Sequence, residues 1–150
     1  MAENILIIGA GSGIGVGLVQ HYCNQGHQVQ AISRQPCPVS MERADVSWLS
    51  PADDQTDVTE GVSEQAVHKV VAEALTAEPA IIFICQGWLH DNQHGPEKTL
   101  RQLNAVQMHK SFDINVLQPA LYLKALFSYL TRQPQVKVLV LSAKVGSITD

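Results

Sequence analysis

The sequence predicts an α/β fold with a doubly wound parallel sheet, and three observations lead to this prediction. Short apolar runs typical of strands alternate along the chain with longer segments of helical periodicity. Three of these runs are apolar almost throughout, as expected for strands covered on both faces. A glycine-rich turn directly follows the first run. With 150 residues, the chain is expected to form a single domain, residues 1–150, with a sizeable core.

The N-terminal part of the chain is expected to form a strand, a helix and a second strand. Residues 4–8, which contain the apolar run 5–8, are expected to form the first strand. Residues 13–25 place their apolar side chains on one helical face, and Gly26 is suited to end that helix. Residues 28–33 form the second expected strand, and two prolines within 35–39 indicate a loop.

The middle of the chain is expected to hold a third strand and a second helix. Residues 41–51 are ambiguous between the possible types of structure, so we place a short third strand at 55–58. Residues 63–76 carry apolar side chains at helical spacing, which predicts a helix with its apolar face turned inward.

The C-terminal part of the chain is expected to hold two further strands around a long helix. Residues 80–85 are apolar throughout and predict the fourth strand, followed by a loop over 86–98. Residues 104–130 read as one long helix, and residues 136–141 as the fifth strand. The broad apolar surface of the long helix should pack partly on the sheet, and the remainder suggests a helix–helix interface.

The segment GAGSGIG, residues 9–15, lies between the first strand and the first helix. Such a turn brings backbone N–H groups and a helix N-terminus to the carboxyl edge of the sheet, where a pyrophosphate can bind. Gly9 allows the tight turn, Gly13 permits close approach of a phosphate, and Gly15 lets the helix pack on the strand. The alternative is a tight turn without a ligand. The interpretation is a Rossmann-type sheet of order 3-2-1-4-5 whose expected cofactor contacts here are Gly9, Gly11, Ser12, Gly13, Ile14 and Gly15.

The end of the second strand indicates which dinucleotide the site would bind. An NAD site usually has a carboxylate there for the ribose hydroxyls, whereas this chain has Ser33 and Arg34. A guanidinium can donate two bonds to a 2'-phosphate, and the serine could donate another. We therefore expect NADP rather than NAD, with a solvated surface position for Arg34 as the alternative. The same two residues argue against a methyltransferase, which would need an acidic side chain there.

The spacing Gly9-x-x-x-Gly13-Ile14-Gly15 resembles that of the short-chain dehydrogenase/reductase family, and later motifs follow in the matching order. Asp57-Val58-Thr59 is similar to the segment whose Asp bonds the adenine amino group in that family. Cys85-Gln86-Gly87 lies where the family usually has Asn-Asn-Ala-Gly, with Gln86 replacing an Asn. The resemblance implies that Asp57, Val58, Gln86 and Gly87 contact the cofactor. The stretch 87–98 is similar to the C-factor-like and carbonyl-reductase-like branch.

The resemblance also implies the residues of the reaction. Asn115 matches the family's catalytic Asn in a helix, and Pro119 four residues later cannot bond the Asn115 carbonyl, so we expect a kink there. Ser147 is the preferred catalytic serine and Ser142 the second, because Ala143 occupies the commonest position. Either serine could instead cap a turn. The family's Tyr-x-x-x-Lys pair should follow Ser147, so we expect these residues to be the N-terminal part of a longer reductase.

Composition excludes several other classes. The net charge is −4 and no run of Lys and Arg forms a basic stripe, which argues against nucleic acid as a partner. No apolar segment approaches the length of a membrane span, so no membrane partner is expected. Three scattered cysteines fit a reducing cytoplasm, and we expect a cytoplasmic protein. His90 and His94 lie in a predicted loop without further ligands nearby, so no metal site is expected.

The sequence therefore predicts an NADP-dependent oxidoreductase that reduces a ketone or aldehyde carbonyl by hydride transfer. Its partners would be a small-molecule carbonyl substrate and further copies of the chain, in a homodimer or homotetramer formed through the long helix. The alternative is a non-catalytic NADP(H)-sensing or protein-interaction protein on the same fold, because the fold does not determine turnover.

Overall fold

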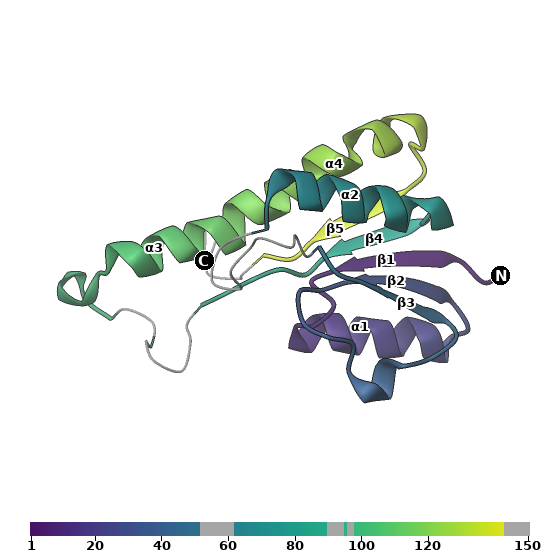
Figure 1. Cartoon of the computed structure of the whole chain (residues 1–150), viewed down its shortest axis with the longest axis horizontal. Coiled ribbons are helices and arrows are strands. Elements are labelled where there is room, and N and C mark those ends of the chain that lie inside the picture. Colours follow the sequence, from purple (N-terminus) through teal and green to yellow (C-terminus); the bar gives the residue numbers. More distant parts are fainter. Residues whose placement is uncertain (52–61, 90–94, 96–97, 143–150) are drawn as a thin grey trace, which may run out of the picture.

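The computed structural model describes residues 1–51, 62–89, 95 and 98–142, and these residues form a parallel sheet with helices on both faces (Figure 1). The sheet order is β3-β2-β1-β4-β5, which confirms the predicted order. All four neighbouring pairs are parallel. The strands are β1 (Asn4–Ile8), β2 (Gln28–Ile32), β3 (Val46–Leu49), β4 (Ile81–Ile84) and β5 (Lys137–Val140).

The helices lie in two layers. Helix α1 covers one face of the sheet, and α2 and α4 lie side by side over the other (Figure 1). Short 3-10 helices occupy Val39–Met41, Leu75–Ala77 and Leu100–Gln102. None of the helices within the described ranges is long and apolar enough to cross a membrane. The main helices are α1 (Gly13–Asn24), α2 (Glu64–Ala74), α3 (Ala105–Phe112) and α4 (Gln118–Arg132).

The central position of strand β1 explains why its sequence is apolar from Ile5 to Ile8. Leu6 and Ile8 are fully buried in the core under α2 and α4. Ile5 and Ile7 point to the other face and are fully buried in the core with α1. Because successive side chains of a strand alternate between faces, a strand covered on both sides needs apolar residues throughout.

The predicted third strand is wrong in its position. The strand that pairs with β2 is Val46–Leu49, within the segment that we found ambiguous, and Trp48 lies opposite Ala31. Our predicted strand at 55–58 lies outside the described residues. β3 is at the edge of the described sheet, and its residues are partly or largely exposed. An edge strand of this kind has no need of a continuous apolar run, which is the signal that identified the inner strands.

The long predicted helix is interrupted in its hydrogen-bond pattern. Asn104 caps α3 by accepting hydrogen bonds from the backbone N–H groups of Val106 and Gln107. Between α3 and α4, residues Asp113–Leu117 form a π-helical turn in which the Gln118 N–H donates to the Asp113 carbonyl. Pro119 follows this turn and has no N–H to donate, which suits it to the first turn of α4. The freed Asn115 carbonyl that we expected stays a prediction.

Candidate functional site

The glycine turn connects β1 to α1 with a positive backbone φ of 81° at Gly9. A Cβ on Gly9 would lie 2.9 Å from the backbone nitrogen of Gln86, so the turn passes tightly against the end of β4. The N–H groups of Gly9 and Ala10 both donate to the Ile32 carbonyl, at 2.9 and 3.0 Å. These contacts fix the turn between the ends of β2 and β4, as the predicted role of Gly9 required.

Two further glycines lie in close contacts, Gly15 against backbone atoms and Gly11 against side chains. A Cβ on Gly15 would clash with the Gly9 carbonyl oxygen and lie 2.8 Å from the Ala10 Cα, so α1 can approach β1 only without it. A Cβ on Gly11 would lie 2.5 Å from the Ser33 hydroxyl oxygen. A Cβ on Gly13 would meet nothing within 4 Å, which leaves the N-terminus of α1 open on that side.

Ser12 caps helix α1 at this turn. Its hydroxyl oxygen accepts a hydrogen bond of 3.0 Å from the Gly15 N–H. The hydroxyl hydrogen is not used in that bond and can be donated to a ligand. The remaining N–H groups of the first helical turn add a positive partial charge beside it. The turn can therefore bind an anion with both backbone and side-chain donors.

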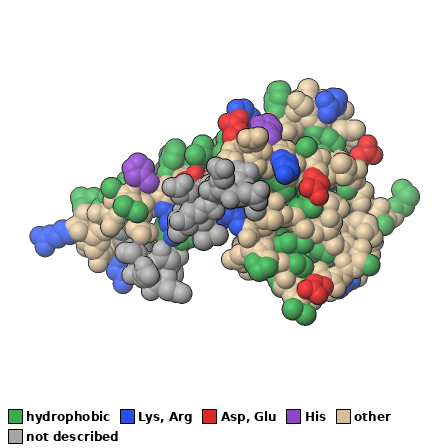
Figure 2. All heavy atoms as spheres, viewed as in Figure 1, with side chains coloured by type: hydrophobic (Ala, Val, Ile, Leu, Met, Phe, Trp, Pro, Cys, Tyr) green, Lys and Arg blue, Asp and Glu red, His purple; other side chains and the backbone are tan. Residues whose placement is uncertain are grey.

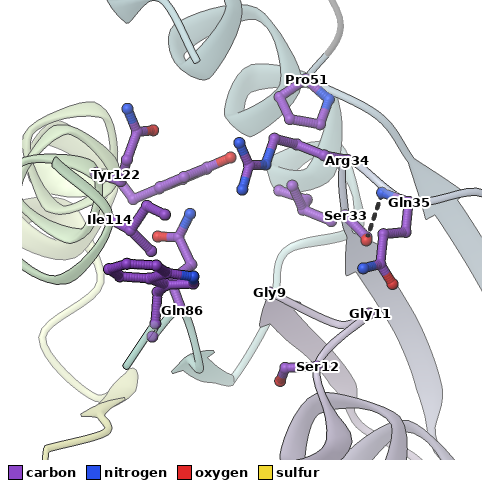
Figure 3. Close-up of a pocket in the computed structure, with 14 residues that line it drawn as sticks. Gly9, Gly11, Ser12, Ser33, Arg34, Gln35, Pro51, Gln86, Ile114 and Tyr122 are labelled. Atoms are coloured by element: carbon purple, nitrogen blue, oxygen red, sulfur yellow. Dashed lines mark hydrogen bonds between the residues drawn. The ribbon is translucent and has the colours of Figure 1, made fainter. Parts of the chain in front are cut away.

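A cavity of about 290 Å³ opens beside the turn, at the carboxyl ends of β1, β2 and β4 (Figure 3). The sheet order reverses between β1 and β4, and this is the place where open α/β sheets bind ligands. Seven of the twelve predicted cofactor residues line the cavity. They are Gly9, Gly11, Ser12, Ser33, Arg34, Gln86 and Gly87.

The end of β2 supplies polar groups to the cavity. Ser33 is buried, and its hydroxyl oxygen accepts a 3.0 Å hydrogen bond from the Gln35 N–H. The Trp48 indole N–H donates to the Gln35 carbonyl at 3.0 Å, so β3 supports this bend. Arg34 is exposed and makes no ion pair within the described part of the chain. Its guanidinium points into the cavity (Figure 3).

The loop after β4 is held by Asn115. The Asn115 carboxamide accepts a hydrogen bond from the Trp88 N–H and donates one to the Trp88 carbonyl, both at 2.8 Å. The Lys110 ammonium lies 4.7 Å from the centre of the Trp88 ring. Asn115 is thus a positioning residue for the wall of the cavity at Gly87 and Trp88, and its side chain does not itself line the cavity.

The other predicted site residues are not brought to the cavity or lie outside the described part. Gly13 and Ile14 are exposed at the start of α1, and Gly15 is buried against the turn. Ser142 is exposed after β5 and does not line the cavity. Asp57, Val58 and Ser147 lie outside the described residues, as do His90 and His94. Since β3 ends at Leu49, Asp57 follows it by eight positions rather than directly.

The structure adds cavity residues that the sequence analysis did not predict. Three of them, Ile114, Gln118 and Tyr122, are spaced by four positions along the π-helical turn and α4 and share one side of the helix. Gln118 is buried, and its amide nitrogen donates to the Val62 carbonyl at 3.2 Å. The sequence did contain one signal, because Gln118 is a polar residue in line with the apolar face of the helix. That signal identifies a cavity residue only when the position at which the helix crosses the sheet is known. The other additions are Ile32, Gln35, Pro51 and Trp88.

Two buried titratable groups near the cavity are neutral at physiological pH. Burial raises the pKa of Tyr122 to about 12, although the charge of Arg34 acts in the opposite direction. Burial also raises the pKa of the Cys85 thiol to about 11. The tyrosine is therefore a hydrogen-bond donor, and the cysteine is a poor candidate for a nucleophile.

A parallel sheet of this order with a glycine turn and a cavity at the reversal point defines a dinucleotide-binding protein class. Comparison of the sequence with family models is more specific, because residues 3–149 match the model described as short chain dehydrogenase. The chain belongs to this family. The search of curated proteins finds no match.

Solved structures agree with this fold assignment. The structure of ElxO with NADP bound has 18% sequence identity and a TM-score of 0.75, with 97% of this chain and 57% of ElxO covered. A short chain dehydrogenase from Leptospira borgpetersenii with bound NAD⁺ has 18% identity and a TM-score of 0.74, with coverages of 100% and 55%. A putative short-chain alcohol dehydrogenase from Burkholderia multivorans has 17% identity and a TM-score of 0.73, with coverages of 100% and 66%. The chain thus spans little more than half the length of the first two.

Proposed function

We propose that this protein is an NADP-dependent oxidoreductase that reduces a ketone or aldehyde carbonyl. The observation that carries the choice of NADP is Arg34, which follows β2 and points into the cavity (Figure 3). No carboxylate lines the cavity within the described part of the chain. A cation there favours a 2'-phosphate, whereas an acidic residue would favour the unphosphorylated ribose of NAD.

The described residues fit a bound dinucleotide. The open side of Gly13, the free hydroxyl hydrogen of Ser12 and the N-terminus of α1 would bind the pyrophosphate. Ser33 and Arg34 would bind the 2'-phosphate, and the Gly87 segment would line the rest of the nucleotide. When bound, the cofactor supplies the hydride to the carbonyl carbon. Asn115 keeps the wall at Trp88 in place through its two backbone hydrogen bonds.

The remaining parts of the function are proposals about the whole protein. Ser147, or Ser142 as the second choice, would hydrogen-bond the carbonyl oxygen of a small-molecule substrate. A tyrosine with a nearby lysine would supply the proton. We also propose a homodimer or homotetramer formed through α3 and α4, and a cytoplasmic location.

A binding experiment tests the choice of cofactor. We expect the protein to bind NADPH more tightly than NADH in a fluorescence titration at low salt. Arg34→Ala should weaken NADPH binding by about 10-fold or more, because a hydrogen bond to a charged group contributes about 1.5–3 kcal/mol. NADH binding should change by less than about twofold. Arg132→Ala removes an exposed arginine from the end of α4 and should leave both affinities unchanged. Tighter binding of NADH, or no binding of either, would contradict the proposal.

Turnover distinguishes the enzyme from the sensor that remains its alternative. The fold alone does not determine turnover, so a non-catalytic NADP(H)-sensing protein is the alternative. The protein expressed from its natural gene should oxidise NADPH when aldehydes or ketones are added. Binding of NADPH without any turnover across a panel of carbonyl compounds would favour the sensor.

A further inference from the structure

Tyr122 reaches the cavity from the side opposite Arg34. It lies on α4, four positions after Gln118, and its ring is part of the core under α2 and α4. Its hydroxyl and the Arg34 guanidinium point toward one another and lie tip to tip in the view of Figure 3. The two side chains come from separate parts of the chain, at the end of β2 and in the middle of α4.

The Tyr122 hydroxyl has no hydrogen-bond partner within the described part of the chain. The residue as a whole is 1% exposed, and it lines the cavity, which solvent can enter. Buried hydroxyl groups in proteins almost always have a partner, because losing the hydrogen bonds to water without replacement is unfavourable. Tyr129, a buried residue two turns after Tyr122 on α4, follows this rule. Its hydroxyl donates a hydrogen bond of 2.9 Å to the Pro79 carbonyl. A phenol that faces a cavity without a partner therefore points to a ligand group.

The chemistry of the two side chains defines that ligand group. Arg34 offers several N–H donors and a positive charge, and it has no ion-pair partner among the described residues. Tyr122 stays protonated at neutral pH and offers one O–H donor. Ser33 lies beside them with its hydroxyl hydrogen unused by the bond from Gln35. A phosphate monoester, with its negative charge and several acceptor oxygens, complements these donors.

We propose that Tyr122 is a second contact for the 2'-phosphate of the cofactor, opposite Arg34, and that this buried hydroxyl contributes to the preference for NADP. The proposal rests on the proposed function. It adds a specificity residue on α4 to the two at the end of β2. The competing possibility is that the hydroxyl contacts the adenine or the ribose, which would not depend on the 2'-phosphate.

Two small probes separate these possibilities. Adenosine 2',5'-bisphosphate and adenosine 5'-monophosphate differ only in the 2'-phosphate. Their dissociation constants are measured by calorimetry for the wild-type protein and three variants: Tyr122→Phe, Tyr129→Phe and Arg34→Ala. Tyr129→Phe is the matched control, because it removes a buried hydroxyl from the same helix but away from the cavity.

We expect Tyr122→Phe to weaken binding of the bisphosphate about 5- to 10-fold, as for the loss of one hydrogen bond to a charged group. Binding of the monophosphate should change by less than about twofold, and Tyr129→Phe should change neither affinity. An equal loss for both probes would assign the hydroxyl to the adenosine and overturn the proposal. An unchanged affinity for the bisphosphate would also overturn it.

The same data keep the two proposals apart. A wild-type protein that shows no preference for the bisphosphate, or an Arg34→Ala variant that keeps the preference, would contradict the proposed NADP site and this inference together. A preference that Arg34→Ala abolishes and Tyr122→Phe leaves intact would contradict only the role of Tyr122.

A second measurement is independent of the folding of any variant. Labelling of tyrosine with carbon-13 at Cζ gives one resonance for each tyrosine, among them those of the residues at 22, 122 and 129. One of them should shift when the bisphosphate is added and stay in place with the monophosphate, because the Cζ shift responds to hydrogen bonding of the hydroxyl. Identical shifts with both probes would contradict the proposal.

Discussion

At the residue scale, Gly15 and Gly17 are a natural pair for testing why the turn is so rich in glycine. Both lie in α1, but a Cβ on Gly15 would clash with the Gly9 carbonyl oxygen, whereas a Cβ on Gly17 would meet nothing within 4 Å. The first glycine is thus required by packing between helix and turn. The second is an exposed helical glycine, which loses more backbone entropy on folding than alanine would and makes no contact that requires a glycine.

We therefore expect opposite effects from the same substitution. Gly15→Ala should lower the free energy of unfolding by about 1–3 kcal/mol, because the clashing atoms belong to the backbone and cannot move aside easily. Gly17→Ala should raise it by up to about 1 kcal/mol through helix propensity. Urea denaturation followed by circular dichroism measures both. Equal effects in the two variants would mean that α1 does not dock as described.

The residue scale also shows what the sequence could predict of the site. Gly9, Gly15, Ser33 and Arg34 were predictable because glycine and charge next to a strand end act locally. Tyr122 was not, because its role depends on where α4 crosses the sheet, and nothing in its neighbours along the chain indicates a cavity. Packing decides which side of a helix faces a site, and the local pattern gives only the apolar face.

At the element scale, the same contrast appears in the strands. The predictions succeeded for β1, β2, β4 and β5. Each of these strands has either an apolar run typical of burial on both faces or a strong pattern of β-forming residues. They misplaced β3, in which a serine and partly exposed side chains weaken the signal of an edge strand. The predicted helix 104–130 exists as two helices around a π-helical turn, since periodicity does not distinguish one hydrogen-bond pattern from the other.

A prediction at this scale concerns the contact between α2 and α4. Glu64 begins α2 and hydrogen-bonds the Lys124 ammonium of α4, with His68 one turn away. Lys124, and to a smaller extent His68, holds the pKa of Glu64 below its ordinary value of 4.5. A lowered pKa in the folded state means that the charged carboxylate stabilises the fold above pH 4.5, and that this stabilisation is lost as the pH falls through the folded-state pKa.

Glu64→Gln should therefore lower the melting temperature slightly at pH 7 and low salt, with no difference from wild type at the acid end of the titration. The effect should shrink at high salt, because the pair is exposed to solvent. Glu73→Gln, which changes another exposed glutamate of α2, is the control. A difference that persists at low pH would show that Glu64 acts through helix capping or packing rather than through its charge.

At the scale of the whole molecule, the polar side chains that line the cavity gather at one edge of the sheet, between the two layers of helices. The core on each face consists of apolar side chains, and the polar cavity lies where β1, β2 and β4 end. The other unusual surface is on α3, which extends beyond this edge, and on α4, which lies over the sheet beside α2 (Figure 1). Hydrophobic side chains are visible along the projecting α3 in Figure 2. Phe112, Val116, Leu123 and Phe127 are exposed at helical spacing, and Phe127 is 68% exposed.

These four side chains form a contiguous apolar stripe, whereas exposed apolar residues on a monomer are usually scattered singly. We therefore expect a second copy of the chain to cover the stripe in solution. Sedimentation velocity should show a dimer or tetramer at micromolar concentration. Phe127→Lys should shift it toward the monomer, because a closed two-fold contact would bring two buried lysines into the same interface. Val39→Lys, which alters an 83% exposed residue in another part of the molecule, should leave the assembly intact. A wild-type protein that is monomeric at about 100 μM would contradict the expected assembly, and a Phe127→Lys variant that stays associated would mean that the interface lies elsewhere.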